Sequence, residues 1–168
     1  MTNTIKSPLP HTEAARSLLN GASSCAVVFN AQHEVSRAFA KDLLHALKPY
    51  RMEVALAAID KKKSELPPLD IAYTAVMNED FNLFRQLKNR GKIADFLARK
   101  YDLLIDTSLS DTWKAEKLIR KIQSRFKIGI NKTSDIFDFR FSLPNTPQNP
   151  AAFDGMLACL EKIDLPGL

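Results

Sequence analysis

Glycine is scarce in this chain, which has only five glycines among its 168 residues. None lies in the turn after the first apolar run, where Asn30, Ala31 and Gln32 stand, and neither GxGxxG nor GxxxxGK[S/T] occurs. A phosphate-binding loop needs glycines because its backbone amides must close on the phosphate oxygens. We therefore expect neither Rossmann-type dinucleotide binding nor P-loop nucleotide hydrolysis.

Histidine and cysteine are scarce too, with three histidines and two cysteines. The chain has no HxxxH, HxD or CxxC spacing and no GxSxG, so zinc binding and nucleophilic hydrolysis both lack their motifs. We assign no catalytic residue, no metal and no cofactor, and the sequence favours a protein that is not an enzyme. Cys25 and Cys159 lie in apolar segments, which predicts two buried free thiols.

Long apolar runs are also missing. No run could span a bilayer, and the first ten residues, MTNTIKSPLP, lack the apolar core of a secretory signal. We expect a cytoplasmic protein with no membrane partner. The length suits one domain with its own core, and we divide the chain into an arm with a short helix (residues 1–22) and a single α/β domain (residues 23–168).

The charge balance is basic but modest, with a net charge of +5 and a pI of about 9.2. Such a balance permits an anionic partner, but the basic residues are spread over several predicted helix faces. Proteins that bind RNA usually add exposed aromatic side chains that stack on bases. Trp113 is predicted on the inner face of a basic helix, so the sequence disfavours a nucleic-acid partner.

Three apolar runs predict buried central strands, at residues 25–29, 54–59 and 102–107. Apolar residues at i, i+3 and i+4 predict helices over residues 32–47, 92–100 and 151–163. Another helix should begin after Ser110 or Asp111, either of which can cap it, and lead to a short strand at residues 127–130. A short helix capped by Thr12 should end at Asn20 and Gly21.

Two further segments predict the outer strands. Residues 71–77 form a strand in this interpretation, but the loop over residues 61–70 is too short for a parallel crossover, so we expect an antiparallel strand or one apart from its predecessor. Residues 136–143 alternate phenylalanine with polar side chains, which is typical of an edge strand. Residues 78–89 predict a loop entering a short helix. The fold class is α/β: a Rossmann-like, three-layer α/β/α sandwich whose sheet of about five to six strands is mostly parallel with mixed edges.

Ligands of open α/β sheets bind beyond the carboxyl ends of the strands. The candidate ligand-binding residues are the polar ones near those ends: Asn30, His33, Asp60, Asp106, Thr107, Ser108 and Asn131. Asp60 and Asp106 could share a Mg²⁺ ion, because hard cations prefer carboxylate oxygens. The interpretation we favour is that these residues form turns and caps, to which Asp, Asn and Ser are suited.

Several blocks of the sequence carry a resemblance to known families. The blocks CAVVFNA, EVALAAID, DFNLF, FLARKYDLLIDTSLS, SRFKIGIN and FDFRF resemble a small bacterial family of uncharacterised domains of about this size, which implies the fold and no activity. Residues 101–131 are also similar to the N-terminal half of heptosyltransferase-type glycosyltransferases. Those enzymes use a second Rossmann-like domain for the sugar nucleotide, for which this chain has no room, so this resemblance implies at most an acceptor-side fold.

Three hypotheses for the function follow. The first is a non-enzymatic interaction module that pairs with itself, as a homodimer, through the edge at residues 137–143. The second is a ligand-binding or glycosyltransferase-like domain with its site at the carboxyl ends of the strands. The third is weak nucleic-acid binding through the basic helix. The sequence names no other partner.

Overall fold

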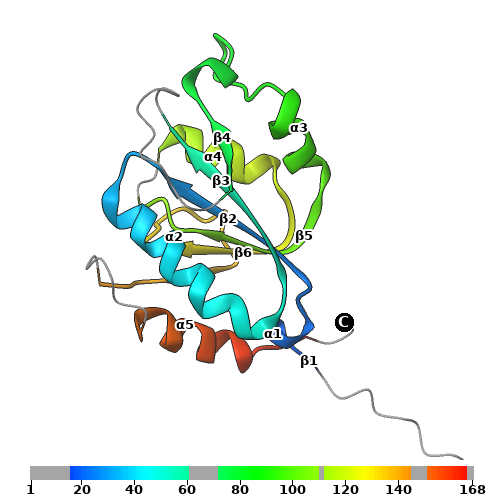
Figure 1. Ribbon diagram of the computed structural model, residues 1–168, viewed down its shortest axis with the longest axis vertical. Helices are drawn as coiled ribbons and strands as arrows, with labels where there is room; N and C mark the ends of the chain where they lie inside the picture. Colours follow the sequence, from blue (N-terminus) through cyan, green and yellow to red (C-terminus); the bar gives the residue numbers. More distant parts are fainter. Residues whose placement is uncertain (1–15, 61–71, 110–111, 145–150, 166–168) are drawn as a thin grey trace, which may run out of the picture.

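Six parallel strands form one open sheet in the computed structural model, which describes residues 16–60, 72–109, 112–144 and 151–165 (Figure 1). The strand order is β4-β3-β2-β5-β6-β7. The strands are β2 (Ser24–Asn30), β3 (Glu53–Ile59), β4 (Thr74–Val76), β5 (Lys100–Asp106), β6 (Gln123–Ile130) and β7 (Phe139–Phe141). A separate antiparallel pair joins β1 (Arg16–Ser17) to β8 (Asp164–Leu165), near the two ends of the described chain.

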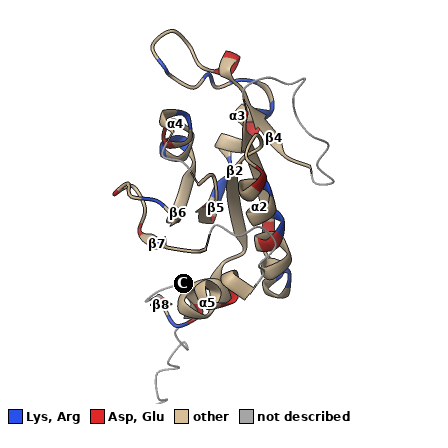
Figure 2. Cartoon of the chain, turned by 90° about the vertical axis from the view of Figure 1, so that its left-hand side faces the viewer, with Lys and Arg blue, Asp and Glu red and all other residues tan. Residues whose placement is uncertain are grey.

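Helices cover both faces of this sheet, which confirms the predicted α/β fold with a largely parallel sheet. One face carries α1 (Leu18–Gly21), α2 (Glu34–Leu47) and α5 (Ala151–Glu161). The other face carries α3 (Gly91–Ala98) and α4 (Trp113–Lys121), and Figure 2 shows α2 and α4 on opposite sides of the strands. Two short 3₁₀ helices, η1 (Lys48–Tyr50) and η3 (Asn78–Asp80), follow α2 and β4.

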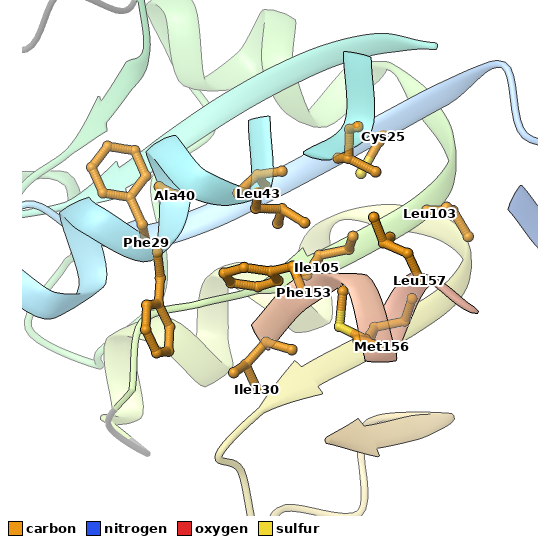
Figure 3. Close-up of a cluster of buried hydrophobic side chains, with 14 of the residues drawn as sticks. Cys25, Phe29, Ala40, Leu43, Leu103, Ile105, Ile130, Phe153, Met156 and Leu157 are labelled. Carbon is orange, nitrogen blue, oxygen red and sulfur yellow. The ribbon is translucent and has the colours of Figure 1, made fainter. Parts of the chain in front are cut away.

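The central strand β2 contributes to two cores because successive side chains point to opposite faces of a sheet. Cys25, Val27 and Phe29 face α2 and α5, where Phe153 packs edge-on against Phe39 with ring centroids 5.5 Å apart. Figure 3 shows Cys25 and Phe29 in the same cluster as Phe153, Met156 and Leu157 of α5. Ala26 and Val28 face α3 and α4. Burial on both faces is why the sequence of this strand is a continuous apolar run.

The chain reverses its direction of travel across the sheet between β2 and β5. From β2 it proceeds outward to β3 and β4, then crosses to β5 and proceeds the other way to β6 and β7. The loops that leave β2 and β5 therefore diverge to opposite faces and open a crevice at the carboxyl ends of these strands. Such a switch point is where open α/β sheets hold their ligands.

The outer strands differ from the prediction in orientation and extent. The antiparallel orientation predicted for residues 71–77 is wrong, because β4 pairs with β3 in parallel. The strand begins at Thr74, so the connection over residues 60–73 is long enough for a parallel crossover. Strand β7 lies at the opposite edge, as predicted, but is three residues long and also parallel. Strand β6 begins at Gln123, four residues before the predicted start.

Helix ends also differ. Ser17 belongs to β1 and caps α1, because its Oγ accepts from the Asn20 amide at 3.3 Å. The helix therefore begins after Ser17 and does not include residues 16–17. The predicted cap, Thr12, lies outside the described residues. Ser110 and Asp111 also lie outside the described residues, and the Thr112 hydroxyl caps α4 instead. Residues 81–87 form a tight loop with a bridge at its base where a short helix was expected.

A carboxylate holds the amino ends of β2 and β5 together. Asp102 Oδ2 accepts from the amide and hydroxyl of Ser23, at 2.7 and 2.8 Å, and from those of Ser24, at 3.1 and 3.2 Å. Partial burial opposes ionisation, but these four bonds together lower the pKa of Asp102. Near it, Cys25 is buried as predicted, whereas Cys159 is exposed, because it lies on the outer side of α5.

Candidate functional site

A cavity of about 340 Å³ occupies the crevice at the switch point. Two strand ends and the start of a helix contribute its lining: Asn30 at the end of β2 with Gln32 after it, Ile59 and Asp60 at the end of β3, and Thr112, Trp113 and Lys114 at the start of α4. The cavity therefore has an aromatic ring, a cation, a carboxylate and two amide side chains around one space. Its size suits a small ligand, since ligand pockets usually range from about 300 to 1,000 Å³.

The polar side of the cavity is ordered by hydrogen bonds between its own residues. Asn30 Oδ1 accepts from the Gln32 amide at 3.0 Å, and Gln32 Nε2 donates to Asp60 Oδ1. Asp60 is only 2% exposed and its amide donates to the Val76 carbonyl at 2.9 Å. Because these groups are held by the ends of adjacent parallel strands, they form a fixed set of hydrogen-bond acceptors and donors.

The opposite side of the cavity is the first turn of α4. Trp113 is 37% exposed, and Phe81 packs edge-on against its ring with centroids 5.0 Å apart. Lys114 lies 5.6 Å from the centre of the same ring and donates to Asn78 Oδ1. The prediction that Trp113 lies on the inner face of its helix is wrong, because its side chain is exposed and lines the cavity, whereas the buried residues of α4 are Ala115, Leu118 and Ile119.

Ser36 and Thr107 tie together the two loops beneath the crevice. Ser36 Oγ accepts from the Asn30 amide and donates to the Thr107 carbonyl, both at 2.8 Å. Thr107 in turn donates from its amide and its hydroxyl to the Val28 carbonyl, at 2.8 and 3.2 Å. Both side chains are fully buried. The predicted site residue Thr107 therefore holds the floor of the crevice and does not line the cavity.

Asp106 and Ser108 form a second cluster, with Lys132. Lys132 Nζ lies 3.1 Å from Asp106 Oδ2 and donates to Ser108 Oγ at 2.8 Å, and the Ser108 amide donates to Asp106 Oδ1 at 2.8 Å. All three side chains are buried. The cavity beside them is about 20 Å³, which leaves room for about one water molecule. This cluster is a buried ion pair and holds no ligand larger than water.

Burial raises the pKa of Asp106, and the Lys132 ammonium together with the bonds to Ser108 opposes that rise. The ionised form of Asp106 is stabilised by the Lys132 cation, because desolvation alone would favour the protonated acid.

Gly129 leaves the space that the Lys132 side chain occupies on its way to Asp106. In the sheet register, Gly129 pairs with Asp106 on the neighbouring strand. A Cβ atom at Gly129 would lie 2.8 Å from the Phe137 ring and 2.9 Å from Lys132 Cγ. The missing side chain therefore gives both residues room to fold back over β6, which is the use of a glycine inside a strand.

The remaining predicted residues do not join either cluster. His33 is exposed and precedes α2 without capping it through its side chain. Asn131 adopts a positive φ of 54° and binds both the amide and the carbonyl of Leu143, at 2.8 and 2.9 Å, so it anchors the chain after β7. Over the part of the chain that the structure describes, no three His, Cys, Asp or Glu side chains gather as a metal site would require.

Of the seven predicted residues, the cavity therefore brings together Asn30 and Asp60. The five other lining residues were missed, although two of them have a signal in the sequence. Gln32 follows the first strand by two residues, and Thr112 is a helix-capping residue type. Lys132 lies in the second cluster and was also missed; it follows a glycine-containing strand, and a glycine inside a strand predicts a close approach by another group.

Two other cavities lie away from the carboxyl ends of the strands. One, of about 350 Å³, is lined by the first half of β3, by Thr74 and by α3, and the other, of about 510 Å³, by the starts of β5 and β6. Both are at the amino-terminal side of the sheet, opposite the end at which open α/β sheets bind ligands. We therefore place the candidate site at the switch point.

The parallel sheet with a cavity at its switch point defines an open α/β protein of the doubly wound class. The chain belongs to a family of unknown function (DUF6913), whose family model matches residues 1–154. No curated protein and no solved structure matches the chain. No helix in the described ranges has the length and apolar character needed to cross a membrane.

Proposed function

We propose that the protein binds a small hydroxylated anion, of the sugar-phosphate class, in the cavity at the switch point. The observation that supports this proposal is the combination of Trp113, Lys114 and Asp60 around one space of about 340 Å³. An aromatic ring packs against the apolar face of a sugar ring, and a carboxylate beside amides accepts and donates hydrogen bonds to hydroxyl groups. A lysine supplies the point charge for a phosphate.

The proposed role is binding without chemistry of its own. The described residues that line the cavity include no cysteine, serine or histidine, and the groups that could act as a base or nucleophile are engaged within the protein: Asp60 Oδ1 accepts from Gln32, Lys114 donates to Asn78 and the Thr112 hydroxyl caps α4. The ligand class also keeps the glycosyltransferase-like hypothesis open, as an acceptor-side site.

Fluorescence of Trp113 tests the proposal directly, because it is the only tryptophan of the chain and lines the cavity. Glucose 6-phosphate, ribose 5-phosphate, glucose and inorganic phosphate are titrated separately. We expect saturable changes with the two sugar phosphates and weaker binding of the separate components, because each component makes only part of the contacts.

Variants identify the side chains involved. Lys114→Ala should weaken sugar-phosphate binding by about tenfold, the effect of one lost charge-assisted bond, while Asp60→Asn should weaken binding of the hydroxylated ligands and spare inorganic phosphate. Lys117→Ala is the matched control, since Lys117 is on the same helix and does not line the cavity. Absence of a fluorescence change with all four compounds, or equal effects of the two lysine variants, would contradict the proposal.

Self-association through β7 is a second candidate. The strand lies at the edge of the sheet, and Phe139 and Phe141 are only partly buried there. An open edge can pair with another chain. Sedimentation equilibrium should then show a dimer that Arg140→Pro dissociates, since proline cannot donate to a ladder. A monomeric mass at all concentrations would exclude this candidate.

A further inference from the structure

The loop over residues 81–87 projects at one end of the molecule, between β4 and α3 (Figure 1), and exposes two large apolar side chains. Leu83 is 99% exposed and Phe84 is 81% exposed, whereas Phe81 and Leu87 pair at the base of the loop and are buried. Adjacent apolar side chains that a fold leaves in water mark a contact surface.

Hydrogen bonds within the loop fix this exposure. Asn82 Oδ1 accepts from the amides of Phe84 and Gln86, both at 2.9 Å, and the Asn82 amide donates to the Gln86 carbonyl at 2.9 Å. Arg85 adopts a positive φ of 56° to complete the turn. The loop therefore presents the Phe84 ring in a defined conformation.

The loop lies alongside α4, so the cations of both segments share one surface. The Arg85 guanidinium is 5.4 Å from the centre of the Trp113 ring. Lys121 Nζ donates to the Leu87 carbonyl at 2.7 Å. These contacts place the base of the loop along the whole length of the helix, with Trp113 at one end and Lys121 at the other.

These two segments hold more basic than acidic residues, although the sequence had suggested that the positive charge is spread out. Residues 78–92 and 113–121 hold eight lysines and arginines against three carboxylates, a net charge equal to the +5 of the whole chain. Arg90 and Arg120 pair with Asp80 and Glu116, and Lys92 lines the cavity between β3 and α3, so the cations that this surface contributes are Arg85, Lys88, Lys114, Lys117 and Lys121. We call these two segments, with Phe84 and Trp113, the basic aromatic surface.

We propose that the basic aromatic surface binds single-stranded nucleic acid. Non-specific binders of single strands combine a cationic track along the phosphates with aromatic rings on which bases stack. Lys114, Lys117 and Lys121 supply the track, since they recur at helical spacing along about 10 Å of α4. Phe84 and the exposed part of Trp113 supply the rings. The sequence disfavoured a nucleic-acid partner because no exposed aromatic side chain was expected, and these two exposed rings remove that objection.

The other anionic or apolar partners fit less well. A surface that binds an anionic bilayer would have its cations grouped around the apolar loop tip that inserts. Here the cations continue along α4, away from Leu83 and Phe84. A second copy of the chain would bring two surfaces of like charge together. Both partners are outcomes that the following test can return.

Fluorescence anisotropy of labelled oligo-dT and oligo-U of about 20 nucleotides tests the proposal. We expect binding at about 20 mM salt that weakens steeply as salt increases, because each phosphate contact releases condensed counterions. Lys117→Ala should weaken binding and reduce the slope of log K against log salt by about one. The matched control is Lys41→Ala, an exposed lysine of α2 on the other side of the sheet, which should have no effect.

Two variants of the loop tip separate stacking from apolar insertion. Phe84→Leu removes the ring and keeps an apolar side chain, and it should weaken oligonucleotide binding by about fivefold or more. Leu83→Ser removes the apolar side chain and keeps the ring, and should change binding little. Asp60→Asn should leave oligonucleotide binding unchanged, which distinguishes this surface from the cavity at the switch point.

Several results would overturn the proposal. One is the absence of an anisotropy change at low salt, and another is an equal effect of Lys41→Ala and Lys117→Ala. A third is greater loss with Leu83→Ser than with Phe84→Leu. Binding to vesicles of phosphatidylcholine with phosphatidylglycerol, without binding to either oligonucleotide, would assign the surface to membranes instead.

Discussion

Replacing Lys132 with methionine should cost a large part of the stability of the protein. The substitution keeps an unbranched side chain over Gly129 and removes the cation that lies 3.1 Å from Asp106 Oδ2. Breaking a buried ion pair by removing one partner typically costs about 3–5 kcal/mol, because the other charge stays buried and uncompensated. For a chain of this length, that loss lowers Tm by about 6–20 °C. Urea unfolding followed by circular dichroism measures the change.

The pH dependence of the loss has a definite sign. Burial already raises the pKa of Asp106, and removal of the Lys132 cation should raise it further. A carboxyl group whose pKa is raised in the folded state binds protons more readily there than in the unfolded chain, where the value is about 3.9. Stability from this group is therefore present at low pH and is lost as pH rises through the folded pKa. The difference between Lys132→Met and wild type should shrink as pH falls toward 4.

A second substitution on the same background separates the charge from the packing. Asp106→Asn removes the negative charge and keeps an oxygen that accepts from the Ser108 amide, so Asp106→Asn with Lys132→Met should recover more than half of the loss. Lys117→Met, at an exposed lysine, is the control and should stay within about 0.5 kcal/mol of wild type. The reasoning is refuted if Lys132→Met costs less than about 1 kcal/mol, if its cost does not depend on pH, or if the double variant is no more stable than the single one.

Three further predictions concern other positions. Gly129→Ala should destabilise the protein by about 1–3 kcal/mol in urea, because the new methyl group would lie under 3.0 Å from two neighbouring side chains, and an unchanged midpoint would contradict this. The pKa of Asp102 is lowered in the folded state, so its stabilising effect is present at neutral pH and lost as pH falls through the folded pKa. In the Asp102→Asn variant the free energy of unfolding should therefore decrease less as the pH is lowered. An unchanged decrease would contradict a stabilising effect of the Asp102 carboxylate. Burial raises the pKa of the Cys25 thiol, whereas Cys159 is exposed, so iodoacetamide should label the native protein at Cys159 alone, as read by peptide mass spectrometry, and labelling of native Cys25 would count against the buried assignment.

The interior of the fold was predictable because burial leaves a direct mark on the sequence. A strand covered on both faces, such as β2, must be apolar at every position, and a helix on one face must repeat its apolar residues every three to four positions. The edges were less predictable, because the orientation of β4 depends on the length of the connection before it. A start at Thr74 instead of residue 71 was enough to permit the parallel crossover.

Two of the seven residues that line the cavity were predictable from their position along the chain. Asn30 and Asp60 end strands, and the carboxyl ends of parallel strands meet at one edge of a sheet. Trp113 was misplaced because helical periodicity assigns an inner face without saying where the sheet beneath it ends. The exposure of Phe84 had no periodic signal, since it depends on the hydrogen bonds of Asn82 within one short loop.

Two strand-terminal aspartates of similar sequence context lie in different surroundings in this structure. Lys132, which follows β6, folds back over Gly129 onto Asp106, and the space beside Asp106 has room for about one water molecule. Asp60 lines a cavity large enough for a ligand, with Lys114 contributed from across the crevice. The described neighbours explain the difference: Lys132, in the connection after β6, folds back onto Asp106 at the end of β5, whereas α2 and α4 lie on opposite faces of the sheet and a cavity remains beside the end of β3 among the described residues. The surroundings of a carboxylate at a strand end thus follow from the directions that the neighbouring connections take.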